Sequence, residues 1–369
     1  MSASVWRKVI LQLSLSYPNE SKLVPMSELR TVEWVNGKVR VVDQTRLPYK
    51  FTYVTFKNHR QVANAIKQMI VRGAPAIGVA AAFGVALAAT SSKARTKEQL
   101  LGELNIAAEV LRKSHPTAWN LFWAIDRVLR LARQVSGEPH EIAQRVVNEA
   151  KSIAEEDVRA NRKIGDYGAA LLENGDTVLT HCNTGTLATV SYGTALAPIR
   201  TAIMQGKKVK VYATETRPRL QGAKLTTYEL LRDGIPVTLI VDGAVGYLME
   251  RGMVRKVMVG ADRITRRFVA NKVGTYLIAL AAREHNVPFY VAAPSSTFDL
   301  RDNESDVKIE ERSPQEVTHI GGKRIVPKGV GVFNPAFDLT PVELVKGFIT
   351  EKGLSAPAEL KAQPRQTVS

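Results

Sequence analysis

From Asn174-Gly175 onward, short apolar segments alternate with segments of helical spacing, and this alternation limits the fold more than any other feature. The apolar segments cover residues 176–180, 208–213, 237–241, 256–259 and 288–292. The helical segments between them cover residues 187–205, 224–232, 243–251 and 271–285. Such alternation is typical of a parallel sheet covered by helices. We therefore predict an α/β fold with a Rossmann-like, mostly parallel sheet and helices on both faces.

The residues before this point follow a different pattern. Asn36-Gly37 lies between two apolar segments, 32–35 and 38–42, and predicts a β-hairpin with a type I′ turn. Helical spacing follows at 59–70, from Pro75 onward, and at 96–111, 116–134 and 139–172. We predict an N-terminal hairpin and helical domain at 1–155 and a C-terminal Rossmann-like domain at 156–369. The strand at 288–292 should be the last, and the tail from Ser355 should be loose.

No membrane segment or signal peptide is expected. The longest apolar run, 74–89, has 16 residues, fewer than the ~18 that indicate a transmembrane span. It is rich in alanine and contains Gly78 and Gly84, a composition that favours a buried, closely packed helix. The start of the chain lacks an uninterrupted apolar stretch after its first basic residues, so the cytoplasm is the expected location.

The chain is basic, with 51 Lys and Arg against 35 Asp and Glu, a formal charge of +16. Such a charge fits either a nucleic-acid partner or a phosphorylated metabolite. The basic residues are spread along the whole chain, and the densest places, 263–267 and 323–328, are short and mixed with apolar residues. This pattern favours a solvated basic surface over a nucleic-acid site.

Several cofactor chemistries are excluded by residue counts and motifs. Cys182 is the single cysteine, so the chain cannot form an internal disulfide or a zinc site with several cysteines. The sequence contains neither a complete G-x-G-x-x-G after a strand nor G-x-x-x-x-G-K-[ST], and it lacks HExxH. We expect no metal and no dissociable cofactor.

Two chemically active side chains lie where predicted strands end. Ligands bind beyond the carboxyl ends of strands in an open α/β sheet, and Cys182 and Asp262 each follow such an end. If a helix begins soon after Cys182, its free amides would stabilise a thiolate; the alternative is a small buried filler. Burial would raise the pKa of Asp262 and suit it to acid–base chemistry. The alternative is a helix cap or an ion pair with Arg263 or Lys272.

Three short segments offer contacts for a phosphate group. Arg72-Gly73-Ala74 combines a guanidinium with the free amides of a predicted helix start. Asn271-Lys272 is predicted to open another helix, and Gln221 follows two nearby arginines. Each alone could be a solvated group or a cap. Together, in a chain without a nucleotide motif, they predict a phosphorylated small substrate.

These residues lie within motifs that resemble the S-methyl-5-thioribose-1-phosphate isomerases. That family belongs to the superfamily of the alpha, beta and delta subunits of translation initiation factor 2B. The resemblance runs in order from about Val32 to Gly353. It is carried by VRGAPAIG (71–78), LTHCNTGTLAT (179–189), ETRPRLQGAKLT (215–226), GADRI (260–264), VANKVGTY (269–276), YVAAPSSTFD (290–299), IEER (309–312) and NPAFDLTP (334–341).

The resemblance implies an activity. Members of the family isomerise 5-methylthioribose 1-phosphate, an aldose, to 5-methylthioribulose 1-phosphate, a ketose, in methionine salvage, a branch of methionine biosynthesis. They use no dissociable cofactor. Asp262 matches the family's proton donor and Cys182 the residue that assists at C1 and C2. The positions that hold substrate, mostly its phosphate, match Arg72, Gly73, Ala74, Gln221, Asn271 and Lys272. The resemblance also implies a homodimer formed through the C-terminal domain.

The chain departs from the family pattern at three places. His115 stands where the family usually has arginine before Pro-Thr-Ala, which would make a phosphate contact weaker and pH-dependent unless Arg112 reaches in. Residues 265–268 replace the usual Asn-Gly-Asp segment with a shorter, more basic one, and Gly243 replaces an asparagine. Two other functions therefore stay open: an isomerase of ribose 1,5-bisphosphate, and a non-catalytic regulatory subunit like those of the initiation factor.

Overall fold

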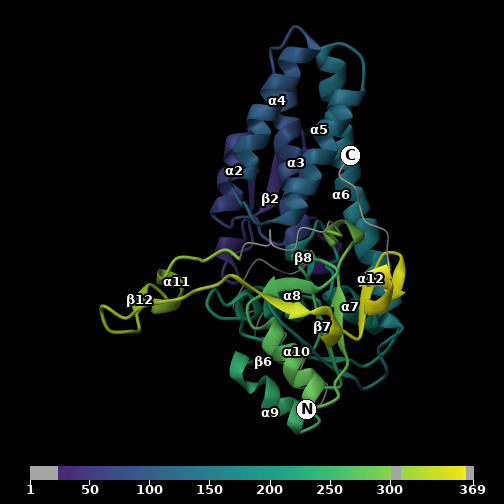
Figure 1. The fold of residues 1–369 in the computed structure, drawn as a ribbon, viewed down its shortest axis with the longest axis vertical. Helices are drawn as coiled ribbons and strands as arrows, with labels where there is room; N and C mark the ends of the chain where they lie inside the picture. Colours follow the sequence, from purple (N-terminus) through teal and green to yellow (C-terminus); the bar gives the residue numbers. More distant parts are fainter. Residues whose placement is uncertain (1–23, 301–308, 363–369) are drawn as a thin grey trace.

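The computed structural model describes residues 24–300 and 309–362. Its upper part is a tower of helices standing on a lower part built around a sheet (Figure 1). The tower contains α2 (His59–Lys67), α3 (Ala74–Ser91), α4 (Lys97–Arg112), α5 (Trp119–Gln134) and α6 (Pro139–Ala169). The helices predicted from spacing are all present here. α6 continues downward into the lower part (Figure 1), so it runs through the predicted domain boundary at 155/156, which stays a prediction.

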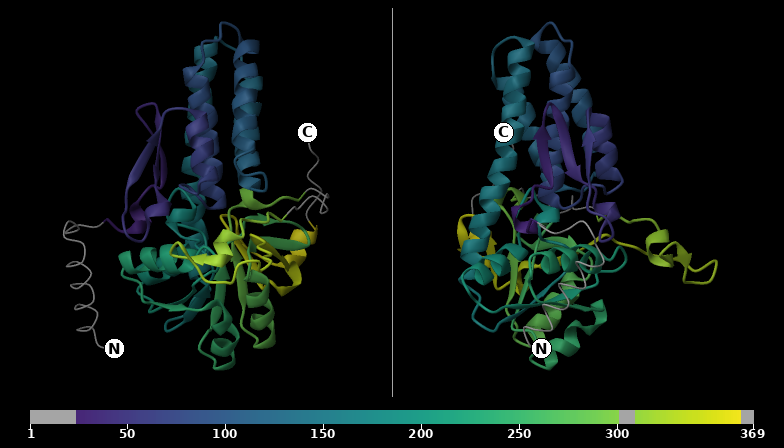
Figure 2. Two further views of the ribbon diagram at one scale, coloured as in Figure 1. Left: turned by 90° about the vertical axis from the view of Figure 1, so that its left-hand side faces the viewer. Right: turned by 180° about the vertical axis from the view of Figure 1, so that it is seen from behind.

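The predicted hairpin is confirmed, with a third strand added. β1 (Val32–Val35), β2 (Lys38–Val42) and β3 (Tyr53–Phe56) form an antiparallel sheet beside the tower (Figure 2). Asn36 and Gly37 have φ angles of 49° and 71°, the left-handed values that a type I′ turn requires at both central residues. The sheet packs on α3 through Val32, Val39 and Val41, which are buried.

α3 forms the centre of the tower. By length and composition it could cross a membrane, but 89% of its most apolar window is buried inside the protein. The neighbouring helices α4, α5 and α6 supply the side chains that cover it, among them Leu104, Leu121 and Val146. The apolar run at 74–89 is therefore a buried core helix, as predicted.

The lower part contains a seven-stranded sheet in the order β15-β14-β10-β7-β4-β5-β6. Neighbouring strands are parallel except for β14 and β15. The strands are β4 (Thr177–Thr180), β5 (Lys210–Thr214), β6 (Val237–Ile240), β7 (Lys256–Val259), β10 (Phe289–Ala292), β14 (Gly347–Thr350) and β15 (Gly353–Ser355). The predicted fold class is confirmed, whereas the prediction that 288–292 is the last strand is wrong.

Helices cover both faces of this sheet. The end of α6, α7 (Leu196–Met204) and α8 (Thr227–Arg232) share a core with Val178 and Met258. α9 (Val245–Glu250) and α10 (Thr275–Glu284) share another core with Leu179 and Val257. Because successive side chains of a strand point to opposite faces, the central strands β4, β7 and β10 contribute to both cores.

Two of the predicted helices begin later than their sequence spacing indicates. The segment predicted as a helix from residue 187 starts with a short helical turn and becomes α-helical only at Leu196, because Tyr192 and Gly193 have φ angles of 73° and 88°. The segment predicted from residue 271 becomes helical at Thr275, after Gly274 at φ 105°. Asn271 and Lys272 therefore end a strand and do not open a helix.

A small antiparallel sheet lies beside the large one and carries these two residues. Its order is β13-β9-β8, formed by β8 (Arg263–Ile264), β9 (Phe268–Lys272) and β13 (Phe337–Pro341). Short helical turns connect the larger elements: η1 (Met26–Glu28), η2 (Gln44–Arg46), η3 (Thr186–Ala188), η4 (Gly222–Thr226), η5 (Asp242–Ala244), η6 (Ser295–Thr297) and η8 (Val342–Leu344).

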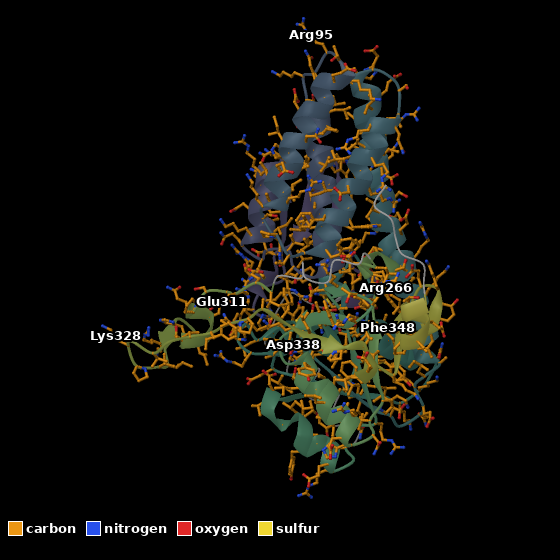
Figure 3. The ribbon with its side chains drawn as sticks, in the orientation of Figure 1. Arg95, Arg266, Glu311, Lys328, Asp338 and Phe348 are labelled. Atoms are coloured by element: carbon orange, nitrogen blue, oxygen red, sulfur yellow. The ribbon has the colours of Figure 1, made fainter. Side chains whose placement is uncertain are left out.

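An arm projects from the body near the small sheet. It contains α11 (Gln315–Thr318), β11 (His319–Ile320) and β12 (Lys323–Arg324), and Figures 1 and 2 show it extending sideways. In Figure 3, Glu311 lies near its base and Lys328 at its tip. Further along the chain, α12 (Pro357–Ala362) shows that the predicted loose tail is helical as far as Ala362. The rest of that tail, and the segment that bears on a signal peptide, lie outside the described residues.

Candidate active site

The order of the strands places the candidate site. From β4 the chain proceeds to β5 and β6 on one side, and then to β7, β10 and β14 on the other. β4 and β7 are neighbours, so the topology reverses between them, and ligands of open α/β sheets bind beyond the carboxyl ends at such a point. Cys182 follows β4 and Asp262 follows β7. Both line one pocket, with an empty volume of about 760 Å³ including its open mouth.

All the residues that the sequence assigned to the site line this pocket. They are Arg72, Gly73, Ala74, His115, Cys182, Gln221, Asp262, Asn271 and Lys272. Among further polar side chains in the wall are Asn183, Arg219 and Arg312, to which the sequence reasoning assigned no role. Apolar side chains complete the wall, including Met69, Ile77 and Phe337.

Asp262 is held by its backbone and leaves its carboxylate open to the pocket. Its N–H donates to the carbonyl of Ala270, 2.9 Å away. Within the described part of the chain its carboxylate has no hydrogen-bond or ion-pair partner. Arg263, one of the two residues named for the alternative of an ion pair, pairs with Asp299 instead. Burial raises the pKa of Asp262 to about 6, although the nearby charges of Arg72 and Lys272 oppose the shift.

Cys182 occupies a left-handed backbone conformation, with φ 62°. Its N–H donates to Thr216 Oγ1 at 2.9 Å, and its carbonyl accepts from Thr226 Oγ1 at 2.6 Å. These hydrogen bonds stabilise a backbone conformation that residues other than glycine rarely adopt. Such conformations are concentrated at functional sites. Burial raises the pKa of the thiol, against the opposing charges of Arg72 and Lys272. A thiolate stabilised by the start of an α-helix was one of two possibilities, and the structure does not favour it, because α7 begins only at Leu196.

His181 points away from Cys182, as strand alternation predicts. Its Nδ1 lies 2.7 Å from Thr214 Oγ1, and its Nε2 lies 2.9 Å from the carbonyl of Val273. Burial lowers the pKa of His181 to about 4, so the ring is neutral near pH 7. Nε2 therefore donates to the carbonyl, and Nδ1 accepts from the threonine. The histidine joins β4 to β5 and the loop before α10 and forms no Cys/His pair.

Arg72 is fixed by Asn183, the residue after the cysteine. Its two terminal nitrogens donate to Asn183 Oδ1 at 2.7 Å and to the Asn183 carbonyl at 2.9 Å. Asn183 is itself buried, and its Nδ2 donates to Glu229 Oε1 at 2.8 Å. The guanidinium is thus oriented without being neutralised, because its partners are uncharged.

The start of α3 offers free backbone amides beside this guanidinium. Gly73 is the residue that caps α3, at φ 92°, and no side chain caps the helix. A Cβ at Gly73 would lie 2.4 Å from Ala188 Cα, so only glycine allows this close approach. Uncapped amides at the start of a long helix form a favourable position for a phosphate.

Lys272 and Asn271 approach from the end of β9. The Lys272 side chain is buried, and within the described residues its ammonium has no hydrogen-bond or ion-pair partner. Burial lowers its pKa. Asn271 donates to Thr275 Oγ1 at 3.0 Å, and Gln221 has a buried Oε1 without a partner in the described structure. An unpaired buried cation beside free amides is suited to an anionic ligand.

His115 lies in the pocket wall, but its surroundings do not favour the positively charged form of its ring. Its Nδ1 is 4.0 Å from Glu310 Oε2, and burial lowers its pKa despite that carboxylate. Arg112 does not reach in; it pairs with Glu109 and Asp126 on the tower. Arg312, from the base of the arm, stands in the wall instead.

Groups of three or more histidine, cysteine, aspartate or glutamate side chains able to hold a metal ion are absent from the described residues.

Comparison with known proteins identifies one family. The model of the initiation factor 2 subunit family matches residues 70–357. The chain belongs to this family.

Relatives within the family are about half identical to the chain. The methylthioribose-1-phosphate isomerase of Thermosipho melanesiensis is 51% identical, covering 89% of this chain and 95% of its own. The isomerase of the same name from Geobacter metallireducens is also 51% identical, covering 90% and 98%. These matches extend over nearly the whole family member, site included.

Solved structures of the family carry two kinds of name. A 5-methylthioribose 1-phosphate isomerase from Pyrococcus horikoshii has a TM-score of 0.82 and 44% identity, over 92% of this chain and 97% of that one. A protein titled translation initiation factor eIF-2B, subunit delta, from A. fulgidus has a TM-score of 0.78 and 49% identity, over 89% and 96%. The fold is thus shared by a protein named as an isomerase and one named as an initiation factor subunit.

Proposed function

We propose that this chain is a methylthioribose-1-phosphate isomerase that converts 5-methylthioribose 1-phosphate to 5-methylthioribulose 1-phosphate in methionine salvage. One observation carries the proposal most directly. Asp262 and Cys182, which follow neighbouring strands, face the same pocket as the uncapped start of α3 and Lys272, which has no ion-pair partner among the described residues. Acid–base groups and an anion site thus converge on one sugar phosphate. The names of the relatives at 51% identity point to the same substrate.

The chemistry requires a proton donor at the substrate. The phosphate on C1 prevents spontaneous opening of the sugar ring to a free aldehyde, so the ring must open with the phosphate attached. A proton is delivered to the ring oxygen as the bond from C1 to that oxygen breaks. The hydrogen of C2 then moves to C1, and the C2 hydroxyl loses its proton to become the ketone. Atoms and charge balance without a cofactor, and we propose none.

We assign the acid–base role to Asp262 and an assisting role at C1 and C2 to Cys182. A carboxyl with a pKa of about 6 populates both protonation states near neutral pH, which general acid–base catalysis requires. The thiol, whose pKa is raised, stays protonated and neutral beside the reacting carbons. Substrate carrying deuterium at C2 distinguishes the two routes for the hydrogen: direct transfer retains the label at C1, and an enediol loses it to water.

The phosphate is proposed to lie at the start of α3. Gly73 and Ala74 contribute amides there, and Arg72 and Lys272 contribute positive charge, with Asn271, Gln221 and His115 around them. The apolar part of the wall, including Met69, Ile77 and Phe337, is suited to the methylthio group. An apolar wall favours this substrate over ribose 1,5-bisphosphate, whose second phosphate would lose its hydration there.

Turnover of both sugar phosphates by the purified protein, measured as ketose formation, tests the proposal. We expect turnover of 5-methylthioribose 1-phosphate at least about a hundredfold higher in kcat/KM, since the preference combines lost apolar contact with burial of a charged group. Equal or reversed preference would favour the bisphosphate isomerase. Absence of turnover, together with sub-micromolar sequence-selective RNA binding at physiological salt, would favour a regulatory subunit.

We also propose a cytoplasmic homodimer. The arm exposes Ile320, Ile325, Val330 and Phe333, and the edge strand β6 exposes Leu239. Apolar side chains gathered on an arm and a sheet edge are suited to burial against a second copy. Sedimentation equilibrium at micromolar concentration should give twice the chain mass of 40.5 kDa, and a monomer would contradict the proposal.

A further inference from the structure

Two arginines in the pocket wall are already bound by one carboxylate. Arg219 and Arg312 both line the pocket. Glu316, in α11 of the arm, accepts from Arg219 at 2.7 Å and from Arg312 at 3.0 Å. Arg219 and Glu316 are far apart in sequence, so this pair also joins the arm to the loop after β5.

The charges of this cluster cancel. Glu310 accepts from Arg312 at 3.0 Å, so two guanidinium groups face two carboxylates. Burial alone would raise the pKa of Glu316, but hydrogen bonds from Arg312 and Arg219 hold it below its usual value. Glu316 therefore stays ionised at neutral pH, and the cluster offers no net positive charge to the pocket.

The other two cationic side chains of the pocket wall differ in this respect. Arg72 is bound only by the uncharged Asn183, and Lys272 has no ion-pair partner in the described residues. Within the described residues, the positive charge that no carboxylate pairs is therefore that of Arg72 and Lys272, which line the pocket together with Gly73 and Ala74 at the uncapped start of α3. The pocket offers one anion site, although its wall contains four cationic side chains able to bind phosphate.

We propose that Glu316 selects a sugar monophosphate over a bisphosphate by occupying the two guanidinium groups that would otherwise bind a second phosphate. This inference rests on the proposed function and identifies a residue that sets its substrate class. A guanidinium binds a phosphate with two parallel hydrogen bonds, and Arg219 and Arg312 would supply such bonds if released. A bisphosphate must break these ion pairs and leave Glu316 without its partners, which is costly for a partly buried carboxylate.

The test measures binding of ribose 1,5-bisphosphate and of 5-methylthioribose 1-phosphate by titration calorimetry. Glu316→Gln removes the charge and keeps the size of the side chain. We expect it to bind the bisphosphate about tenfold or more tightly than wild type, the gain typical of a released charge-assisted contact. Affinity for the monophosphate should change less than about threefold, because Glu316 forms no hydrogen bond or ion pair with Arg72 or Lys272 in the described residues and reaches Lys272 only through its charge.

Glu311→Gln is the matched control. Glu311 is exposed near the base of the same arm (Figure 3), and its replacement removes the same charge. It should leave both affinities unchanged. The double variant Arg219→Gln/Glu316→Gln should lose most of the gain, because a released guanidinium is then missing. Melting curves of every variant check that the arm and body stay folded.

The outcomes separate this inference from the proposed function. Wild type that binds neither sugar phosphate contradicts the proposed function. Wild type that binds the monophosphate, with Glu316→Gln folded but no tighter for the bisphosphate, overturns the role of Glu316 alone. An equal gain in Glu311→Gln would also overturn it, since the effect would then be one of general charge.

Discussion

The two walls of the pocket differ in what they offer a ligand. The wall formed by the start of α3 presents backbone amides and the oriented guanidinium of Arg72. The wall formed by the ends of β4 and β7 presents Cys182 and Asp262, whose pKa values are raised by burial. The first wall holds charge and the second exchanges protons. Substrate binding and turnover should therefore be separable by mutation, one wall at a time.

The strongest test of this separation is Asp262→Asn. The change keeps the shape of the side chain and removes its proton exchange, so kcat should fall by roughly 10²–10⁴-fold. KM should change little, because Arg72 and Lys272 still hold the phosphate. Steady-state kinetics measures both. Asp166→Asn, an exposed aspartate on α6, is the control. A variant that keeps more than about a tenth of wild-type kcat would make Asp262 a structural residue.

Cys182→Ser should give the next largest effect. Serine is nearly the size of cysteine, but its hydroxyl is a much weaker acid than the thiol. We therefore expect kcat to fall by about tenfold or more while KM stays close to wild type. Single-turnover measurements separate the chemical step from product release. An increase in KM with unchanged kcat would show that Cys182 contributes to substrate binding and not to the chemical step.

Arg72→Ala probes the other wall and should reverse the pattern. It removes a charged phosphate contact, so KM should rise by roughly 10–100-fold, the usual cost of such a bond. The same kinetics with Arg60→Ala, an exposed arginine on α2, provides the control. Loss of kcat without a rise in KM would show that the wall at the start of α3 takes part in the chemical step and not only in substrate binding.

The smallest effect is expected at Asp157, a buried carboxylate on α6 that lies outside the pocket. Burial raises its pKa to about 7, although bonds from the Val190 N–H and Asn161 oppose the shift. A raised folded-state pKa stabilises the fold at low pH, and this contribution is lost as the pH rises through about 7. Asp157→Asn should therefore melt about 2 °C or more above wild type at pH 8. At pH 5 the two should melt together or the variant lower.

This last variant also sharpens the comparison of the walls. Because Asp157 touches neither wall, kcat and KM should stay within about twofold of wild type. A large kinetic change would show that the α6 contact to Val190 controls the geometry of the pocket. A melting difference independent of pH would mean that Asp157 does not change its ionisation on unfolding.

The sequence was sufficient for the fold class because periodicity is a local property. The five strands β4, β5, β6, β7 and β10 follow directly from it, and the strand-end rule brought Cys182 and Asp262 to one edge. The start of α7 was misplaced because Tyr192 adopts a left-handed φ that its residue type does not announce. Asn271 and Lys272 were placed on a helix because their pairing partner, β13, lies more than sixty residues later.

The site was predictable where chemistry and motif agreed, and incomplete where it depends on distant segments. All the assigned residues line one pocket. Arg312 lies in the IEER motif, but the motif alone assigned it no role, because it lines the pocket only from the base of the arm. Asn183 could have been found from its place beside Cys182, but its partners, Arg72 and Glu229, come from unrelated parts of the chain. Networks between segments of this kind have no signature in a single sequence.

The long helix α6 has a mechanical consequence for the pocket. It has 31 residues, a rod of about 46 Å at 1.5 Å per residue, and it packs against both α3 in the tower and α7 on the sheet. Neither glycine nor proline interrupts it between His140 and Ile164. A long helix without a flexible point holds the elements packed at its two ends at a fixed distance, and this sets the width of the pocket between the two walls. We expect substrate to be admitted by movement of the surrounding short loops, while the span of the opening is set in advance by the stiffness of one helix.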